Sequence, residues 1–308
     1  MFEREPFSGL LHLNPARKNT LPSGLFATDM DGTLLLPGQD FNRQDILALD
    51  SLGKMNILRV IASGRSPFSF YRMMGEKILP VDYLVLSSGA GILDYRTGEY
   101  LRTSSMPVTQ TFYAVRQLTD NGYDFCLQGT DPGSHVFTYS YGSEYNPDME
   151  NRIAIYAGHC RPLEDDDGKR VSTQLVVIIP PGRQEGALGK VTDLLGESYS
   201  ILRSTSPLDG KSLWIEVFPA GVSKSTGVEW IASRHGITGK DVAAVGNDYN
   251  DHDLLEWAGH AFVVEDSPEH LRTRFREVPS VSEGGVAEAA RLWLIERGEL
   301  SEGDAWPE

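Results

Sequence analysis

Cysteine is scarce in this sequence. Only Cys126 and Cys160 occur among 308 residues. Two cysteines provide neither a disulfide framework nor the spacing of a cysteine-based metal site, so a reducing compartment is the simplest expectation. We assign no chemistry to either residue.

Long hydrophobic runs are also missing. The longest apolar stretches, such as residues 175–179, are far shorter than the roughly 20 residues that a membrane-spanning helix needs. Glu3, Arg4 and Glu5 stand where a signal peptide would place its apolar segment. We therefore expect a cytoplasmic protein without a membrane partner.

Basic residues are few relative to acidic ones. The chain has 28 Lys and Arg against 43 Asp and Glu, a formal net charge of -15. Nucleic-acid binding depends on clustered Lys and Arg, so we expect no nucleic-acid partner. An anionic substrate would need a local cation or a metal ion in such a protein.

Apolar residues make up 40% of the chain, which is enough for a sizeable core in one large domain or two ordinary ones. Near the start, apolar strand patterns at 24–28, 56–62 and 83–86 alternate with helical patterns at 42–52 and 68–78. This alternation predicts an α/β fold with a parallel sheet and helices on both faces.

The pattern changes between residues 104 and 209. Aromatic and polar residues mix there, turn signals are frequent, and a strand at 174–179 ends at Pro180-Pro181-Gly182. We predict a smaller inserted α+β domain at 104–209 and a discontinuous core made of 21–103 and 210–300. The core pattern resumes with strands at 213–218, 242–245 and 261–264 and helices at 223–235, 251–257 and 286–297.

Asp29 and Asp31 follow the first strand directly. In an extended chain, residues two apart point to the same side, so both carboxylates could bind a hard cation such as Mg²⁺. Gly32 fits a sharp turn, and Thr33 can hydrogen-bond within the loop. For Asp-x-Asp-Gly alone, an ordinary turn is an equal alternative.

A second polar loop, Ser63-Gly64-Arg65, follows the second strand. A hydroxyl and backbone N–H groups at a helix N-terminus form an anion site, and a nearby arginine can bind a phosphate with two hydrogen bonds. The alternatives are a simple helix cap for Ser63 and a solvated surface side chain for Arg65.

The order of these loops resembles the haloacid dehalogenase superfamily of phosphatases, in its Cof-type and sucrose-phosphatase-like branch. The resemblance covers nearly the whole chain and implies a Rossmann-like core with an α/β cap inserted between the second and third motifs. It rests on four segments: 29–35, 61–65, 219–228 and 245–255.

The resemblance implies roles for single residues. Asp29 would be the nucleophile and Asp31 the general acid and base. The Ser63 hydroxyl and the next backbone N–H, that of Gly64, would hold phosphoryl oxygens. Lys224 would pair with the nucleophile and the phosphoryl group. The implied cofactor is Mg²⁺, and Arg65 remains a candidate substrate ligand.

The fourth motif departs from the family pattern. Relatives usually have an aspartate where this chain has Asn247, and Asp248 follows one residue later. Either Asn247 binds the metal through its carbonyl oxygen or Asp248 takes its place. Asp251 is expected to orient Lys224 or a metal-bound water. The candidate metal ligands are therefore Asp29, Asp31, Asn247, Asp248 and Asp251, while His252 and Asp253 are expected on the exposed face of a short helix.

The substrate is less defined. We expect a small phosphorylated metabolite, a sugar or polyol phosphate, and a monomer or homodimer. Ser88 stands where the family has an asparagine, which could alter a substrate contact. The acidic run 164–167 lacks the alternation of a calcium-binding loop, so we expect a solvated loop. Cap aromatics could contact a sugar ring, but they more often build a core: Tyr123, Phe125, Tyr139, Tyr141 and Tyr145.

Two other functions remain open at this point. One is a phosphotransferase or mutase that passes the phosphoryl group to a sugar rather than to water. The other is a non-catalytic module that binds phosphosugars. A binding module does not need a nucleophile, so the joint presence of Asp29, Asp31 and Lys224 favours an enzyme.

Overall fold

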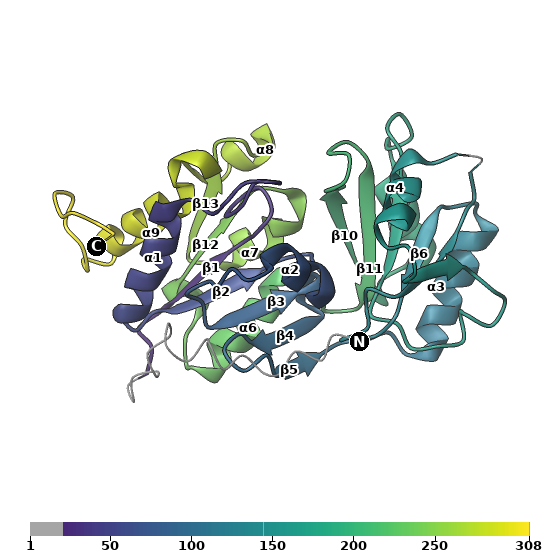
Figure 1. The fold of residues 1–308 in the computed structure, drawn as a ribbon, viewed down its shortest axis with the longest axis horizontal. Helices are drawn as coiled ribbons and strands as arrows, with labels where there is room; N and C mark the ends of the chain where they lie inside the picture. The colour runs from purple at the N-terminus through teal and green to yellow at the C-terminus, as the bar shows by residue number, and fades with distance from the viewer. Residues whose placement is uncertain (1–20, 144, 308) are drawn as a thin grey trace. The chain divides into compact units, whose positions relative to one another are not determined.

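The computed structural model describes residues 21–143 and 145–307 (Figure 1). Contacts divide these residues into two compact units. Unit 1 comprises 21–64, 74–102 and 224–307, and unit 2 comprises 65–73, 103–143 and 145–223. None of the described helices is both long and apolar enough to cross a membrane.

Unit 1 contains an eight-stranded sheet in the order β14-β13-β12-β1-β2-β3-β4-β5. The first six of these strands run parallel to their neighbours, and β4 pairs antiparallel with β3. The strands are β1 Leu25–Thr28, β2 Leu58–Ala62, β3 Tyr83–Leu86, β4 Gly91–Asp94, β5 Tyr100–Thr103, β12 Val242–Gly246, β13 His260–Val264 and β14 Arg276–Val278.

Helices cover both faces of this sheet. Leu25 and Ala27 of β1 share a core cluster with apolar residues of α6 and α7, whereas Phe26 contacts Trp293 of α9, with 6.0 Å between ring centroids. Alternate residues of a strand point to opposite faces, so α6 and α7 lie on one face and α9, with α1 beside it, on the other. The helices of unit 1 are α1 Arg43–Lys54, α6 Lys224–Arg234, α7 His252–Trp257, α8 Glu269–Arg272 and α9 Gly285–Glu296.

The predicted fold class is confirmed: the core is a parallel α/β sheet with helices on both faces. Its central strands are buried along their whole length, as expected for parallel strands covered on both sides. The edge strands β4 and β5, and β14 at the other edge, were not predicted, because they are short and carry no long apolar run.

Unit 2 contains a six-stranded mixed sheet in the order β10-β11-β9-β6-β7-β8. Helices α3 and α5 pack on one face of this sheet, and α4 packs on the other. Helix α2, Pro67–Met74, also belongs to this unit except for its last residue. The other elements are β6 Phe125–Gln128, β7 Phe137–Ser140, β8 Cys160–Pro162, β9 Leu175–Ile179, β10 Tyr199–Thr205, β11 Leu213–Pro219, α3 Val108–Asp120, α4 Pro147–Ile155 and α5 Ala187–Leu195.

Strand β11 corrects one expectation. We predicted that residues 213–218 open the second half of the core sheet, but β11 pairs antiparallel with β9 and β10 of unit 2. The buried Glu216 on β11 accepts a hydrogen bond from Ser204 Oγ of β10 at 3.0 Å. A short apolar run predicts a strand but contains no information about which sheet the strand joins.

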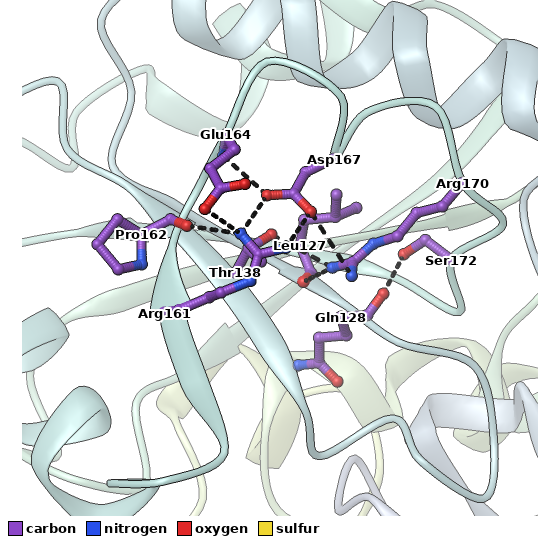
Figure 2. A network of polar contacts seen from close by, with 9 residues as sticks. All are labelled: Leu127, Gln128, Thr138, Arg161, Pro162, Glu164, Asp167, Arg170 and Ser172. Atoms are coloured by element: carbon purple, nitrogen blue, oxygen red, sulfur yellow. Dashed lines mark hydrogen bonds and ion pairs between the residues drawn. The ribbon is translucent and has the colours of Figure 1, made fainter.

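The acidic run 164–167 corrects a second expectation, that of a solvated loop. Glu164, Asp165 and Asp166 are exposed as predicted, but Asp167 is buried and accepts two hydrogen bonds from the Arg161 guanidinium, at 2.8 and 2.7 Å (Figure 2). Burial opposes the charge of Asp167, yet the bonds from Arg161 and from the Glu164 N–H lower its pKa below the usual value. Asp167 is therefore the anchor of this loop.

Figure 2 shows how the anchored loop is joined to the sheet of unit 2. Arg170 donates to the carbonyl oxygen of Leu127 and to Thr138 Oγ1, and Ser172 Oγ donates to the carbonyl oxygen of Gln128. These contacts tie the loop to β6 and β7. Both oxygens of the Asp167 carboxylate accept hydrogen bonds from Arg161, so this carboxylate is not available to bind calcium.

The aromatic residues considered as sugar contacts are not all buried. Phe125 is fully buried in the core of unit 2, and Tyr123 packs against that core. Tyr139 is half-buried, whereas Tyr141 and Tyr145 are exposed. The core interpretation therefore holds for Phe125 and fails for Tyr145.

Candidate active site

The carboxyl ends of three neighbouring strands bring the first and fourth polar loops together. Thr28, the last residue of β1, lies level with Val245 of β12 on one side and Ile61 of β2 on the other. Asp29 continues the ladder, because its N–H donates to the carbonyl oxygen of Val245 at 2.9 Å. Its carboxylate thus starts at the edge of the sheet, where ligands of parallel sheets bind.

The loop after Asp29 folds back tightly on itself. The N–H of Gly32 donates to the carbonyl oxygen of Leu35 at 2.9 Å, and that of Leu35 donates to Met30 at 2.9 Å. Gly32 has a φ of +81°, which explains a glycine at this position. The Thr33 hydroxyl is buried and has no hydrogen-bond partner within the described residues, so its expected bond in the loop is not made.

Lys224 is the centre of the site. It is fully buried at the start of α6, and its Nζ lies 2.6 Å from Asp29 Oδ1, 2.6 Å from Asp251 Oδ1 and 3.4 Å from Asn250 Oδ1. Burial lowers the pKa of Lys224, but the charges of Asp251 and Asp29 outweigh it and raise the pKa above its usual value. The ammonium therefore stays charged, and the contact with Asp29 that the resemblance implies is present.

The surroundings of Asp29 disfavour its ionised form. Only 4% of the residue is exposed. Burial raises the pKa of Asp29 to about 7, the charges of Asp251 and Asp31 add to the rise, and Lys224 opposes it. A further cation beside Asp29 would favour the ionised carboxylate, which is the form that can act as a nucleophile.

Asp251 has a partner for each oxygen. Oδ1 binds Lys224, and Oδ2 accepts from the backbone N–H groups of Asn247 at 2.9 Å and Asp248 at 3.1 Å. Gly246 leaves room for this contact, since a Cβ there would lie 2.6 Å from the Asp251 Cβ. These bonds fix the carboxylate of Asp251 toward Lys224.

Asn247 and Asp248 point in different directions. A Cβ on Gly32 would collide with the side-chain amide of Asn247, so this amide lies against the loop that carries Asp31. The side chain of Asp248 instead caps the short 3₁₀ helix Tyr249–Asp251, accepting from the N–H of its third residue. Of the two, Asn247 is the side chain beside the first loop.

The second polar loop is built from the end of β2. Ser63 is buried, and its N–H donates to the carbonyl oxygen of Val85 at 2.8 Å, which aligns it with the end of β3. Gly64 is half-buried. Arg65 belongs to unit 2, where its guanidinium donates to Ser69 Oγ of α2 at 3.0 Å.

Asp253 has a role that sequence reasoning missed. We expected it on an exposed helix face, but its Oδ2 accepts from the N–H of Ser225 at 3.1 Å and from Ser225 Oγ at 2.6 Å. It therefore caps the N-terminus of α6 next to Lys224. The two residues are 28 apart in sequence, so no local pattern could have revealed the contact.

The donor set fits a hard cation. The charge of Asp31 acts on Asp29, and the Asn247 amide lies against the loop that carries Asp31. Mg²⁺ in proteins usually binds one or two carboxylates together with waters and a phosphate. No group of three or more His, Cys, Asp or Glu arranged to hold a metal occurs in the part of the chain that the structure describes. Mg²⁺ does not require such a group, because it usually keeps several waters and one or two protein carboxylates.

The fold is of the α/β class, and the buried carboxylate–lysine–carboxylate cluster of Asp29, Lys224 and Asp251 lies at the carboxyl ends of its parallel strands, where such proteins bind ligands. The family model of haloacid dehalogenase-like hydrolases matches residues 26–289. The chain belongs to this family, and it is a phosphatase. The resemblance noted in the sequence is thereby confirmed.

Two bacterial relatives illustrate the likeness in sequence. The chain is 25% identical to the HMP-PP phosphatase of Klebsiella pneumoniae strain 342 over 252 residues, which cover 80% of this chain and 86% of the relative. It is 23% identical to the HMP-PP phosphatase of Escherichia coli strain 55989 over 266 residues, covering 83% and 89%.

Solved structures share the fold. The phosphatase BT1666 from Bacteroides thetaiotaomicron aligns with a TM-score of 0.72 at 21% identity, covering 93% of this chain and 99% of that one. The subclass IIB sugar phosphatase BT4131 aligns with a TM-score of 0.67 at 15% identity, covering 90% and 100%. The chain thus shares the fold of these proteins over most of its length.

Proposed function

We propose that this phosphatase hydrolyses the phosphate monoester of a small metabolite through a phosphorylated Asp29. The observation that carries the proposal is the buried contact of 2.6 Å between Asp29 and Lys224. Burying an ion pair is costly, so a pair kept at the ligand-binding edge of a sheet has a functional explanation.

The reaction proceeds in two steps. Asp29 attacks phosphorus in line with the ester oxygen, the P–O bond to the leaving group breaks, and Asp31 protonates the departing alcohol. Asp31 then deprotonates a water molecule, which attacks phosphorus, releases inorganic phosphate and restores Asp29. Asp31 is half-exposed, in keeping with its need to exchange protons with substrate and water.

The other proposed ligands act on the non-bridging oxygens of the phosphoryl group. The Lys224 ammonium would neutralise the negative charge that builds on these oxygens, and the Ser63 hydroxyl and the Gly64 N–H would donate hydrogen bonds to them. Such stabilisation is the main source of catalysis in phosphoryl transfer. Arg65 stays a proposed substrate ligand, for the phosphate or for the leaving group.

The proposed metal site consists of Asp29, Asp31 and Asn247. When bound there, Mg²⁺ would supply positive charge that lets a carboxylate approach a phosphate dianion. Asp248 is assigned a structural role because its side chain caps a helix, and Asp251 a positioning role because both its oxygens are engaged.

The proposed substrate is a phosphorylated sugar or polyol. Support comes from the fold shared with the sugar phosphatase BT4131 and from the exposed Tyr141 and Tyr145 of the inserted domain, whose rings suit a sugar face. We assign substrate selection to unit 2, which contains the insertion predicted at 104–209 together with β11, and the catalytic residues to unit 1.

The test is a phosphate-release screen over sugar, polyol and aryl phosphates, run with Mg²⁺ and with EDTA. We expect release that depends on Mg²⁺ and is absent from Asp29→Asn. Equal release by Asp29→Asn would overturn the role of Asp29. Transfer of the phosphoryl group to an added sugar in preference to water would instead identify a phosphotransferase.

A further inference from the structure

Two consecutive serines after β3 have a left-handed backbone. Ser87 has a φ of +47° and Ser88 a φ of +51°, and they are 1% and 0% exposed. Among the residues that the structure describes, Asn56 is the only other non-glycine with a positive φ, and asparagine tolerates this region far better than serine. Two adjacent strained serines persist only where their surroundings hold them.

One side of this turn holds the second polar loop. The N–H of Ser63 donates to the carbonyl oxygen of Val85 at 2.8 Å, and the N–H of Ser88 donates to the carbonyl oxygen of Ser63 at 3.0 Å. The backbone of Ser63 is therefore bonded on both sides, to the end of β3 and to the strained turn. This N–H belongs to the peptide that joins the two left-handed residues, so its direction depends on the conformation of both Ser87 and Ser88.

The other side of the turn supports helix α6, which begins with Lys224. The two elements pack against each other, and the contact runs through Gly227, one turn into the helix. A Cβ on Gly227 would lie 2.5 Å from a methyl group of Val85 and 3.4 Å from the Cα of Gly89. The backbone of α6 therefore rests directly on residues 85–89.

We propose that the turn formed by Ser87, Ser88 and Gly89 is a positioning element, which sets Ser63 relative to Lys224 and depends on the left-handed conformation of Ser88. This inference rests on the proposed function, in which both Ser63 and Lys224 bind the phosphoryl group. Ser88 itself is assigned no contact with the substrate.

The mechanism is a change in the direction of one backbone N–H. If residue 88 moved to the right-handed region, its N–H would turn away from the Ser63 carbonyl, and the Ser63 hydroxyl would lose its fixed place beside the phosphoryl group. The contact between Lys224 and Asp29 would remain. Formation of the transition state should therefore suffer more than substrate binding.

Three substitutions at Ser88 separate backbone conformation from side-chain chemistry. Ser88→Gly removes the hydroxyl but adopts a positive φ freely, and Ser88→Asn is larger yet tolerates it. Ser88→Thr keeps the hydroxyl but adds a branch at Cβ, which disfavours the left-handed region. Asparagine is the control for size, because it is bulkier than threonine.

We expect Ser88→Gly and Ser88→Asn to hydrolyse p-nitrophenyl phosphate with a kcat within about threefold of the wild type. Ser88→Thr should lower kcat about tenfold or more, with KM changed much less, at temperatures well below its melting point.

Two results would overturn the inference: a Thr variant as active as the wild type, or a Gly variant whose kcat falls about tenfold or more. The Gly and Asn measurements decide the question even where the Thr variant does not fold. Inactivity of the wild type toward every phosphate ester would instead overturn the proposed function, so the two failures are distinct.

Discussion

Lys224 carries a buried ammonium that contacts two carboxylates, so its replacement should affect both activity and stability. Replacing it with glutamine leaves Asp29 and Asp251 buried side by side without a cation. We expect Lys224→Gln to abolish phosphatase activity and to lower the free energy of unfolding by about 3–5 kcal/mol. Urea denaturation checks the second effect.

The matched control is Lys190→Gln, an exposed lysine on α5. It should change the free energy of unfolding by less than about 0.5 kcal/mol and leave activity intact. A Lys224→Gln protein as stable as the wild type would show that the two carboxylates are not charged together in the folded chain.

Asn247 gives a second prediction at the scale of single residues. If its amide oxygen is a metal ligand, Asn247→Asp adds a negative charge to the site and should tighten Mg²⁺ binding about tenfold, as measured by calorimetric titration. Asp248→Ala should leave the Mg²⁺ affinity within about twofold and lower stability by about 1 kcal/mol through loss of a cap. The reverse pattern of Mg²⁺ affinities would assign the metal to Asp248.

At the scale of elements, Asp45 joins α1 to the N-terminus of α9. Its Oδ1 accepts from the N–H of Ala287 at 2.7 Å, and the carboxyl group is fully buried. Burial raises the pKa of Asp45 to about 7, although the N–H groups of Ala287 and Val286 oppose the rise. The folded protein therefore favours the protonated form.

This arrangement predicts a pH dependence with a definite sign. A carboxyl group whose pKa rises on folding contributes its full stability below the unfolded pKa of about 3.9 and loses it as pH rises through about 7. We expect the stability of the wild type relative to Asp45→Asn to fall between pH 4 and 8, by up to about 4 kcal/mol. Chemical denaturation of both proteins across this range measures the difference, and a flat difference would contradict it.

The loop anchored by Asp167 provides another test at this scale. Asp167→Ala leaves Arg161 and Arg170 without their shared carboxylate and should lower the free energy of unfolding by about 1–3 kcal/mol. Asp166→Ala is the control, because its exposed ion pair with Lys169 is worth at most about 0.5 kcal/mol. Equal effects in urea denaturation would rule out a special role for Asp167.

At the scale of the whole molecule, the sequence predicts some features far better than others. Five of the six parallel strands of the core were found within about two residues because each is a short, mostly apolar run beside a helical pattern, which is a local signal, whereas β14 was missed. Other features depend on partners that no local pattern identifies. These are the sheet that β11 joins, the hydrogen bonds between Asp253 and Ser225, and the ion pair that buries Asp167. Among the site residues, the motifs located Asp29 and Lys224, but the different directions of Asn247 and Asp248 became visible only in three dimensions.

The division into units predicts the behaviour of a fragment. Residues 103–223 contain all six strands and three helices of unit 2, so we expect this fragment to fold alone. It lacks Phe68, whose ring stacks on His135 at 4.1 Å between centroids, and should therefore melt below the unit-2 transition of the full chain. Circular dichroism and thermal melting test this, and an unfolded fragment would contradict it.

The separation of Asp29 and Lys224 also has a consequence for synthesis on the ribosome. The two residues are 195 positions apart, and β12, which lies next to β1 in the sheet, follows later still. At about 5–20 residues per second, roughly 10–40 s pass between the emergence of the carboxylate and that of its ammonium partner. Throughout this interval the nascent first half has neither the neighbouring strand nor the cation of its finished form, so the core completes its folding only after the inserted unit has been made.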